Sequence, residues 1–510
     1  MQLSSADHSS VPPRIEVPRE YNAAHDLIER NLQAGRGAKV AFHDDAGSIT
    51  YAQLAERVNR FGSGLMAMGL RMEDRVLIAM HDTADWPVAF LGAIRAGIVP
   101  VAVNTLLTSK DFQYMLSDSR AKALIVSEAL LPQFKPILEG LPFLQHVIVS
   151  GSSFNDVLAK GQPQLAPAPT TRDDACFWLY SSGSTGMPKG TVHAHASMIE
   201  TAELYARGVL GIAESDVVFS AAKLFFAYGL GNSLSFTLAV GATTVLMAER
   251  PTPAAVFKRL TQRKPTLFYG VPTLYAAMLA DPNFPKREQL ALRRCVSAGE
   301  ALPPQISKGF KEKTGLDILD GIGSTEMLHI FLSNRPGDFR YGTTGKAVPG
   351  YELRLVDEQG ELGELEISGS TSAMYYWNNR AKSRATFAGG WTKSGDKDTQ
   401  DADGFYVYGG RTDDMLKVGG IWVSPAEVEA ALVSHEAVLE AAVVGMEDEQ
   451  KLVKPKAYVV LKQGAKVSDE ELKAHVKARL APYKYPRWIE FAAELPKTAT
   501  GKIQRFKLRS

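Results

Sequence analysis

The chain has 510 residues, which is more than one ordinary core holds and suggests two to four structural units. Lys and Arg number 57 against 56 Asp and Glu, so the formal net charge of +1 favours neither nucleic acid nor an anionic membrane as a partner. Hydrophobic residues make up 45% of the chain and charged residues 22%, as in ordinary soluble globular proteins. We therefore expect small-molecule partners.

Cysteine use and the terminal segments bear on location. Cys176 and Cys295 each lie in an apolar, strand-like run, which argues against a disulfide framework or a zinc site and predicts buried thiols. Residues 1–20 are polar and contain prolines, and no apolar run is long enough to span a bilayer. The final Leu-Arg-Ser is not a peroxisomal signal. A cytoplasmic location is the default expectation.

Between about residues 39 and 321, short apolar runs alternate with amphipathic segments. The apolar runs predict strands at residues 75–80, 101–103, 123–126, 146–149, 217–221, 243–247, 267–271 and 295–298. The segments between them predict helices, among them residues 86–96, 253–263 and 304–314. This alternation predicts layered α/β subdomains with parallel sheets.

After residue 341 the pattern changes to an alternation of period two. Residues 351–356, 364–368 and 405–408 show it, around turn sequences at 357–360 and 401–404. Such segments predict an antiparallel, β-rich subdomain.

A second change follows residues 409–414. Beyond it, predicted helices alternate with predicted strands, at residues 425–435, 438–444, 455–461 and 469–480. We therefore predict a large N-terminal domain of residues 1–412, with α/β subdomains to about 340 and a β-rich subdomain over about 341–412. Residues 413–510 are predicted to form a small, mobile α+β C-terminal domain.

The loop at residues 180–190, Tyr-Ser-Ser-Gly-Ser-Thr-Gly-Met-Pro-Lys-Gly, is the most informative segment. Its glycines can present bare N–H groups, its hydroxyls can bind phosphate oxygens or magnesium, and Lys189 adds a positive charge. A P-loop has glycine directly before its lysine, where this chain has Pro188, so a P-loop kinase or ATPase is disfavoured. The apolar run at 177–180 predicts a buried strand before the loop, which favours a nucleotide loop over a flexible linker.

Further motifs follow this loop in a fixed order. They are Gly-Glu-Ala-Leu-Pro at 299–303, Asp-Gly-Ile-Gly-Ser-Thr-Glu at 320–326, Lys-Ser-Gly-Asp at 393–396, Gly-Arg-Thr-Asp-Asp at 410–414 and Pro-Lys-Thr-Ala-Thr-Gly-Lys at 496–502. With the loop, this series resembles the adenylate-forming superfamily, which holds acyl-CoA and aryl-CoA ligases, luciferases and peptide-synthetase adenylation domains. Within it, residues 223–232 resemble the benzoate–CoA ligase group.

The resemblance implies a two-step reaction that uses ATP, Mg²⁺ and CoA. An aromatic carboxylate attacks the α-phosphorus of ATP to give an acyl-adenylate and pyrophosphate, and the CoA thiol then displaces AMP. Two other functions stay open: a non-catalytic nucleotide-binding regulator, which would need damaged motifs, and a luciferase-like enzyme that uses its adenylate without CoA.

The resemblance implies catalytic roles for Lys502, Glu326 and Thr185. Lys502 would bridge the carboxylate and the α-phosphate, because two anions brought within a few ångströms repel strongly at intermediate dielectric. Glu326 would orient Mg²⁺, with Thr185 near the pyrophosphate. Taken alone, Lys502 would be an ordinary solvated lysine and Glu326 a helix-start residue.

The nucleotide site is likewise implied by the motifs. Adenine would lie against the turn at 299–301, where Asp320 would accept a hydrogen bond from its amino group. Asp396 would accept hydrogen bonds from the ribose hydroxyls, and Arg411 would lie near the ribose or the α-phosphate. The residues assigned to ATP and AMP are Ser181, Ser182, Gly183, Ser184, Thr185, Gly186, Lys189, Gly299, Glu300, Ala301, Asp320, Gly321, Ile322, Ser324, Thr325, Asp396, Arg411 and Lys502. As isolated residues, most would be routine turn or surface positions.

The acyl pocket would decide the substrate. Its walls are assigned to Phe226, Ala227 and Tyr228 on one side and to Gly323, His329 and Ile330 on the other. No acidic residue lies between 223 and 232, which argues against amino-acid substrates. His329 is either a partner for a ring substituent or a satisfied structural histidine. Benzoate is favoured, with 4-hydroxybenzoate, a halobenzoate and 2-aminobenzoate open and a fatty acid less expected.

Two reactions at one site imply that the small domain rotates. Asp413 is the predicted hinge, and Lys417, Gly419, Gly420 and Trp422 are assigned to a CoA tunnel, although a hairpin turn would use the same glycines. Acetylation of Lys502 would remove the charge that adenylation needs, so a lysine acetyltransferase and a deacetylase are candidate partners. A homodimer is left open.

Overall fold

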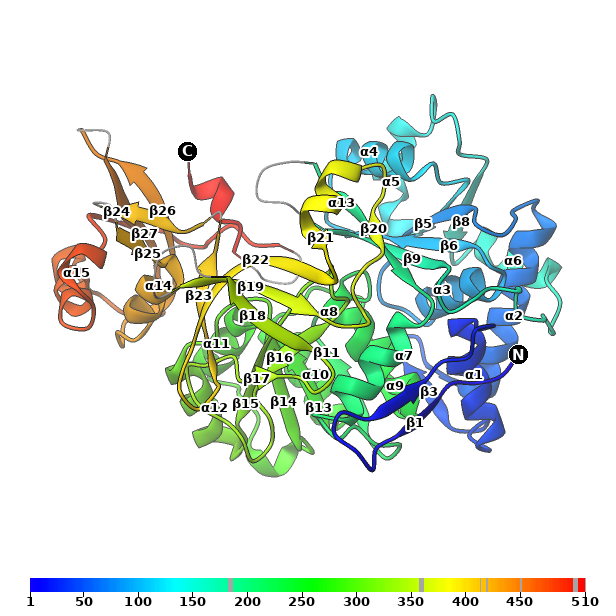
Figure 1. The fold of residues 1–510 in the computed structure, drawn as a ribbon, viewed down its shortest axis with the longest axis horizontal. Helices are drawn as coiled ribbons and strands as arrows, with labels where there is room; N and C mark the ends of the chain where they lie inside the picture. The colour runs from blue at the N-terminus through cyan, green and yellow to red at the C-terminus, as the bar shows by residue number, and fades with distance from the viewer. Residues whose placement is uncertain are drawn as a thin grey trace.

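The structure is a computed structural model that describes residues 1–181, 187–356, 362–412, 414–418, 421–449, 452–498 and 503–509. Figure 1 shows a large body, coloured blue to yellow, and a smaller body beside it in orange and red. In the part of the chain that the structure describes, every helix is too short or too polar to cross a membrane. Cys176 and Cys295 are free and buried, which confirms the prediction for both thiols.

The first sheet of the large body has a parallel core with an antiparallel edge. In spatial order its strands are β20 (Tyr375–Tyr376), β10 (Lys189–Ala194), β9 (Ala175–Ser181), β6 (Val99–Ala102), β5 (Arg75–Ala79), β7 (Ala123–Ser127) and β8 (His146–Ser150). Strands β9, β6, β5, β7 and β8 run parallel, and β10 and β20 are antiparallel to their neighbours. Strand β7 is buried along its whole length, as its continuous apolar sequence predicts for a strand covered on both faces.

The second sheet positions the site. In spatial order its strands are β17 (Lys346–Ala347), β16 (Ile330–Ser333), β15 (Ile318–Gly323), β14 (Arg294–Ala298), β13 (Leu267–Gly270), β11 (Val217–Ser220), β12 (Thr243–Val245), β3 (Val40–His43) and β4 (Ser48–Thr50). Strands β13, β14 and β15 are parallel neighbours. Their carboxyl ends therefore share one edge, and the 299–301 and 324–326 motifs follow β14 and β15 there.

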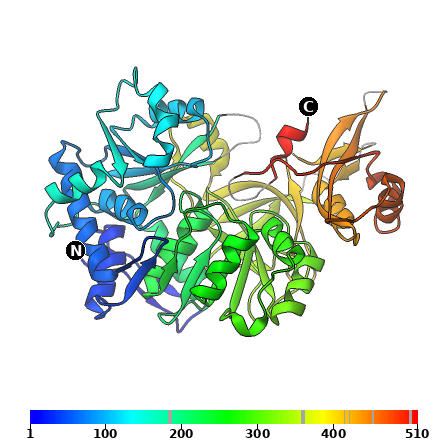
Figure 2. The ribbon, with the colours of Figure 1, turned by 180° about the vertical axis from the view of Figure 1, so that it is seen from behind.

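Helices cover both sheets, as Figures 1 and 2 show from opposite sides. They are α1 (Ala23–Gln33), α2 (Tyr51–Ala67), α3 (Asp85–Arg95), α4 (Ser109–Ser119), α5 (Leu131–Phe134), α6 (Ser153–Lys160), α7 (Ser197–Thr201), α8 (Ala227–Leu230), α9 (Phe236–Val240), α10 (Pro253–Gln262), α11 (Pro272–Ala280) and α12 (Pro304–Thr314). Thr50 and Gln53 form a capping box at the start of α2, and Thr252 caps α10 ahead of a proline at its first position. The predicted α/β alternation is confirmed.

The chain begins with a hairpin that the polar N-terminal sequence did not predict. Strand β1 (Ser5–Asp7) pairs antiparallel with β2 (Arg14–Glu16). His8, in the turn, contacts the buried Glu203 at 2.7 Å, which fastens this hairpin to the π-helical segment η3 (Ala202–Arg207).

The β-rich subdomain is antiparallel, as predicted. It contains β18 (Glu352–Val356), β19 (Gly363–Ser368), β22 (Trp391–Gln400), β21 (Phe387–Ala388) and β23 (Tyr406–Arg411), with helix α13 (Arg380–Thr386) beside it. Asp401 accepts hydrogen bonds from the backbone N–H groups of Asp403 and Phe405, which closes the turn between β22 and β23.

The small body is an α+β unit, as predicted. It contains β24 (Leu416–Val418), β25 (Ile421–Val423), α14 (Pro425–Val433), β26 (Val438–Glu447), β27 (Val453–Leu461), α15 (Asp469–Lys477), β28 (Trp488–Phe491) and the 3-10 segment η7 (Arg505–Leu508). Val428 and Leu472, from its two helices, pack with Val443 and Val459 of the sheet in a separate core. The exact boundary between the two bodies stays a prediction.

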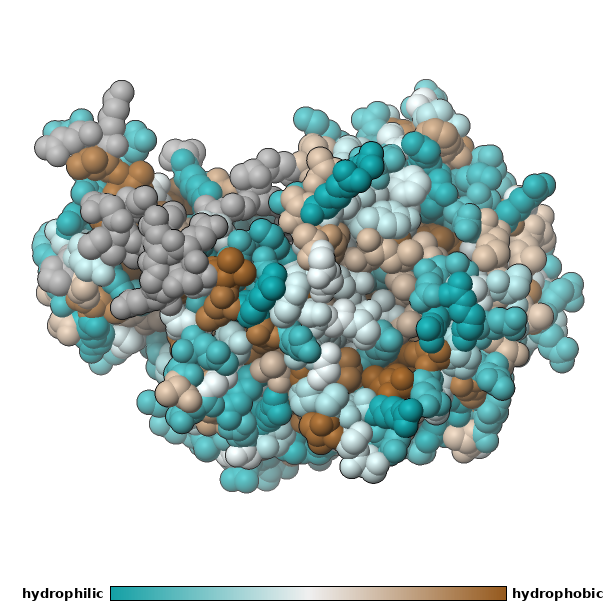
Figure 3. Space-filling model, viewed as in Figure 1, coloured by the Kyte–Doolittle hydropathy of each residue, from teal (hydrophilic) through white to brown (hydrophobic). Residues whose placement is uncertain are grey.

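The outer surface is mixed in character. On the face drawn in Figure 3, polar residues predominate and apolar ones occur in small groups. Val356 and Val407 of the β-rich subdomain are among the exposed apolar side chains. Scattered apolar residues of this kind are normal for a soluble surface.

Candidate active site

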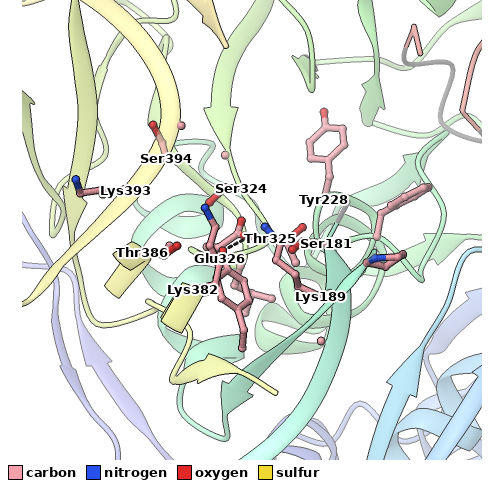
Figure 4. A pocket seen from close by; sticks show the side chains of 18 of the residues that line it. Ser181, Lys189, Tyr228, Ser324, Thr325, Glu326, Lys382, Thr386, Lys393 and Ser394 are labelled. Atoms are coloured by element: carbon pink, nitrogen blue, oxygen red, sulfur yellow. Dashed lines mark hydrogen bonds between the residues drawn. The ribbon is translucent and has the colours of Figure 1, made fainter. Parts of the chain in front are cut away.

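A cavity of about 750 Å³ lies where the large body, the β-rich subdomain and the small body meet. Figure 4 shows Lys189, on β10, and Glu326, in the loop after β15, on its walls, with Lys382 and Thr386 of α13 nearby. Thr498 of the small body also lines it. A volume of this size is in the range of ligand pockets.

Most of the predicted site residues that lie in the described ranges meet in this cavity. It is lined by Ser181, Lys189, Gly299, Glu300, Ser324, Thr325, Glu326 and Arg411, and by the six acyl-pocket residues Phe226, Ala227, Tyr228, Gly323, His329 and Ile330. Asp320, Gly321, Ile322 and Asp396 are not among the lining residues, and Ala301 lines a neighbouring cavity.

Several other predicted residues fall outside the described ranges. They are Ser182, Gly183, Ser184, Thr185, Gly186, Asp413, Gly419, Gly420 and Lys502. The side chains of Lys417 and Trp422 are also not described. Their roles stay predictions.

The carboxylate of Glu326 is held by a hydrogen bond from β20. The Tyr376 hydroxyl donates to Glu326 Oε1 at 2.8 Å. Burial and the Glu326 carboxylate raise the pKa of Tyr376, so this hydroxyl keeps its proton. The Nζ atom of Lys189 lies 4.7 Å from the centre of the Tyr376 ring. Tyr376 thus connects the lysine of the phosphate loop to the predicted magnesium carboxylate.

His193 on β10 holds the loop that carries Glu326 through a hydrogen bond to its backbone. Its Nε2 lies 2.7 Å from the carbonyl oxygen of Thr325, which can only accept, so Nε2 carries the proton. Burial lowers the pKa of His193 to about 4 and keeps the ring neutral. This bond anchors the backbone directly before Glu326.

The residues around Glu326 fit a magnesium ion held together with substrate phosphates. Glu326, Ser181 and Ser324 place carboxylate and hydroxyl oxygens on the cavity wall. Within the described ranges, no group of three or more His, Cys, Asp or Glu side chains could hold a metal ion alone. Mg²⁺ is commonly bound by one or two carboxylates plus phosphate oxygens, which is the donor set available here.

The predicted ribose side contains a preformed ion pair. Arg411 Nη1 lies 3.2 Å from Asp396 Oδ1, where β22 and β23 run antiparallel. Asp396 is the main cause that raises the pKa of Arg411. Arg411 lines the cavity with Asp396 behind it, so the pair presents its cationic member to the cavity.

Asp320 lies deeper than predicted. It is buried in β15, burial raises the pKa of its carboxyl well above the usual range, and its Oδ1 has no hydrogen-bond partner among the described residues. An acceptor role toward adenine stays a prediction.

The acyl side of the cavity is rigid. Tyr228 follows the start of α8, and its hydroxyl donates to the carbonyl oxygens of Gly270 at 3.3 Å and Val296 at 3.4 Å. Opposite it, a Cβ on Gly323 would lie 2.6 Å from the carbonyl oxygen of His329. Only glycine permits this close approach of two backbones.

His329 has one satisfied and one unsatisfied ring nitrogen. It is 2% exposed, and its Nε2 donates to the carbonyl oxygen of Tyr228 at 3.2 Å and to Asn232 Oδ1 at 3.1 Å. Its Nδ1 is buried without a partner among the described residues. Burial lowers the pKa of His329 to about 3, so Nδ1 is an uncharged acceptor at neutral pH. His329 is therefore a structural histidine that keeps one acceptor available.

The family is decided by two matches. Residues 28–377 match the model of the AMP-binding enzyme family, and residues 427–502 match the AMP-binding enzyme C-terminal domain. The chain belongs to the AMP-binding enzyme family. This confirms the resemblance to adenylate-forming enzymes. The predicted domain boundary at 412/413 falls between the two matches.

Two relatives are similar to this protein over nearly the whole chain. A benzoate–CoA ligase of Thauera aromatica is 63% identical over 100% of this chain and 99% of its own length. A 4-hydroxybenzoate–CoA/benzoate–CoA ligase of Rhodopseudomonas palustris is 50% identical over 96% of this chain and 94% of its own.

Two solved structures have the same fold as this chain over nearly its whole length. A benzoate CoA ligase from Burkholderia xenovorans LB400 has a TM-score of 0.91 and 56% identity, covering 96% of this chain and 100% of that one. The anthranilate CoA ligase AuaEII, in complex with anthranoyl-AMP, has a TM-score of 0.93 and 46% identity over 96% and 97% of the two chains.

The sequence did not indicate several residues that stabilise the site of this AMP-binding enzyme through long-range hydrogen bonds. Asp82 accepts from the backbone N–H of Leu224 at 3.2 Å, and Lys223 Nζ donates to the carbonyl oxygens of Met247 and Glu249. These bonds hold the segment that leads into the acyl wall. Lys223 lies in the motif at residues 223–232. Asp82 and Tyr376 carried no local sequence signal, because their hydrogen-bond partners lie 142 and 50 residues away along the chain.

Proposed function

We propose that the protein is a benzoate–CoA ligase, an AMP-forming acid–thiol ligase that activates benzoate with ATP and transfers the acyl group to CoA. One observation carries the proposal: a single cavity joins a phosphate side with Lys189 and Glu326 to an aromatic slot of Phe226, Tyr228 and His329. The 63% identity to a benzoate–CoA ligase over the whole chain supports the same reaction.

In the first step, the benzoate carboxylate attacks the α-phosphorus of ATP and pyrophosphate leaves. Lys189 and Arg411 line the cavity and supply positive charge to the phosphates. Lys502 bridges the carboxylate and the α-phosphate in this proposal. Glu326 and Thr185 hold Mg²⁺, which when bound neutralises phosphate charge and polarises the phosphoryl oxygens.

In the second step, the CoA thiol attacks the carbonyl carbon of benzoyl-adenylate and AMP leaves. The thiol has to reach the carbonyl that Lys502 faced in the first step, so the small domain rotates about Asp413. Lys417, Gly419, Gly420 and Trp422 line the route for the pantetheine arm. These assignments rest on the motifs that the chain shares with its family.

The substrate follows from the acyl wall. The slot has apolar and aromatic sides, and no acidic side chain lies in the segment that forms one wall, so it suits a plain ring. A substituted ring with a hydrogen-bond donor is the second candidate, because His329 Nδ1 is a buried acceptor without a partner among the described residues. Such a substrate would be 4-hydroxybenzoate or 2-aminobenzoate.

Acid-dependent AMP formation with ATP and CoA tests the proposal directly. The panel contains benzoate, ring-substituted benzoates and medium-chain fatty acids. We expect benzoate to have the highest kcat/KM and product formation to require CoA. Preference for a fatty acid would contradict the aromatic slot, and product formation without CoA would favour a luciferase-like use of the adenylate.

The remaining expectations belong to the same proposal. The enzyme would act in the cytoplasm, and a homodimer is an open arrangement that sedimentation would test. Acetylation of Lys502 would switch off adenylation by removing its charge. Mass spectrometry of the native protein, with activity before and after deacetylation, checks this.

A further inference from the structure

A glutamate of the large domain holds the C-terminal segment beside the cavity. Glu300 follows β14, and its Oε1 accepts a hydrogen bond from the backbone N–H of Ile503 at 2.8 Å. The two residues are 203 positions apart in the chain. Ile503 directly follows Lys502 in the sequence. The bond therefore connects the predicted adenine side of the site to the segment that carries the predicted catalytic lysine.

The segment that Glu300 holds is a fixed part of the small domain. Ile503 forms a β-bridge with Lys497, and its side chain packs among Ala442, Tyr458 and Val460 of strands β26 and β27. Lys497 Nζ is bound to Glu440 Oε1 at 2.6 Å. The bridge joins the two residues that flank positions 498–502 in the chain. The hydrogen bond from Ile503 to Glu300 therefore acts on a residue that is fixed in the small domain.

An ion pair close to Ile503 in the sequence adds positive charge near Glu300. Arg505, two residues further on, is paired with Glu429 through contacts of 2.9 and 2.6 Å. Burial lowers the pKa of Arg505, but Glu429 and, more weakly, Glu300 raise it, so the guanidinium stays charged. The Glu300 carboxylate lies in the field of this cation, which comes from the same segment as Ile503.

Thr498 directly follows Lys497, the bridge partner of Ile503. It lines the main cavity together with Glu300 and Arg411. The contact between Glu300 and Ile503 therefore belongs to an arrangement in which Thr498 borders the main cavity.

We propose that Glu300 is a positioning residue for adenylation, whose carboxylate holds the base of the loop that carries Lys502 at the phosphate side. The role rests on the proposed function, in which Lys502 serves the first half-reaction only. Rotation of the small domain for thioester formation would break the bond, so Glu300 would have no part in the second half-reaction. Glu300 therefore acts on one half-reaction of the two.

The test compares the two half-reactions in variants of the full chain. Pyrophosphate release from benzoate and ATP reports the first, and benzoyl-CoA formation from supplied benzoyl-adenylate reports the second. For Glu300→Ala we expect kcat of the first to fall by about 10- to 100-fold, the factor of a lost hydrogen bond to a charged group, and the second to stay within about twofold. Glu300→Gln keeps an acceptor oxygen, so we expect a loss of about threefold in the first only.

Glu427→Ala is the matched control. Glu427 lines the cavity between the domains that Glu300 also lines, but its partner, Lys484 at 2.7 Å, lies in the same small domain. We expect both half-reactions of this variant to match those of the unchanged protein.

Three results would overturn the inference. Equal loss of both half-reactions in Glu300→Gln, with an unchanged melting temperature, would assign Glu300 a general structural role. A higher KM for ATP at unchanged kcat would assign it to the nucleotide instead. Absence of acid-dependent pyrophosphate release in the unchanged protein would overturn the proposed function itself, and this inference with it.

Discussion

The acyl wall and the C-terminal segment border one cavity but are built in different ways. The His329 ring donates a hydrogen bond to the carbonyl oxygen of Tyr228 within one domain, and His329 is 2% exposed. The C-terminal segment reaches the cavity across a domain boundary, where the Ile503 N–H meets the Glu300 carboxylate. The proposed ring-binding wall thus lies within one domain, whereas the segment that carries Lys502 in the sequence belongs to the small domain, for which we propose a rotation.

This difference separates selectivity from chemistry. Changes in the acyl wall should alter which acid reacts, and should affect both half-reactions through the same slot. Changes on the C-terminal side should split the half-reactions while leaving the preferred acid unchanged.

Lys502→Ala should have the largest effect. Without its ammonium group, the carboxylate and the α-phosphate repel at the moment of attack, and we expect pyrophosphate release to fall by about 100- to 1000-fold, as when a preorganised charge-stabilising donor is removed. Conversion of supplied benzoyl-adenylate to the thioester should persist. Half-reaction assays measure both, and an equal loss of the two would contradict the division of roles.

Tyr376→Phe should have a smaller effect on the same step. The ring below Lys189 stays, but Glu326 loses its 2.8 Å hydrogen bond, so the carboxylate is less well oriented toward Mg²⁺. We expect the Mg²⁺ concentration for half-maximal adenylation to rise about tenfold, in keeping with the loss of a group that orients a metal ligand. The melting-temperature increase produced by ATP with Mg²⁺ should also shrink.

Tyr351→Phe is the control for this prediction. Tyr351 is also buried and also loses one hydroxyl contact, to Thr371 at 2.9 Å, but it does not line the cavity. An identical change of Mg²⁺ dependence in both variants would show that Tyr376 has no special relation to Glu326.

Much of the fold could be predicted because its signals are local. Helix α12 begins at Pro304 and ends before Gly315 in sequence and structure alike, since proline and glycine mark the two ends. Strand β6 begins at Val99, earlier than predicted, because Pro100 in the run hid its start. Helix α15 ends at Lys477, short of the predicted residue 480. The short polar strands β1 and β2 offered no apolar periodicity at all.

The site was predictable only where motifs named its residues. Glu326, Lys189 and the acyl wall follow glycine-rich or aromatic motifs, and the structure brings them into one cavity. Asp82 and Tyr376 act through long-range hydrogen bonds, which leave no local pattern. The hydrogen bonds of the His329 ring are made to Tyr228 and Asn232. They depend on how residues 228–232 pack against His329, about a hundred positions away, so the sequence alone could not predict them.

Gly231→Ala should change selectivity by a modest factor. A Cβ at this position would lie 2.3 Å from His329 Cδ2, so the imidazole has to move in the slot. We expect KM for benzoate in the first half-reaction, and KM for supplied benzoyl-adenylate in the second, to rise by roughly 10-fold, as for a misfitted methyl group in a pocket. Gly309→Ala, in helix α12, is the control because its Cβ would meet Leu279 only at 3.6 Å. An equal change in both variants would exclude a role for the slot.

Above neutral pH, the acyl wall should show no pH effect on binding. The pKa of His329 is lowered by burial to about 3, and burial raises that of Asp82 to about 6, so neither group changes charge between pH 7 and 8.5. KM for benzoate should be constant over this range. A change there that Gly231→Ala abolishes would show that His329 titrates.

The buried histidines should instead make a contribution to stability that is lost in acid. His193 and His195, with pKa values lowered to about 4, and His329 are neutral in the fold but take up protons below about pH 6.5 when unfolded. The unfolded chain then binds more protons, so the free energy of unfolding decreases as the pH drops from 6.5 toward 4. Asp82 has the opposite sign, because its raised pKa adds stability at low pH that is lost as pH rises through about 6, and burial also raises the pKa values of Asp320 and Asp398. The histidine contribution is therefore isolated by substitution: the urea denaturation midpoint should fall more from pH 7 to pH 5 in the unchanged protein than in His195→Gln, and an equal fall in both would contradict it.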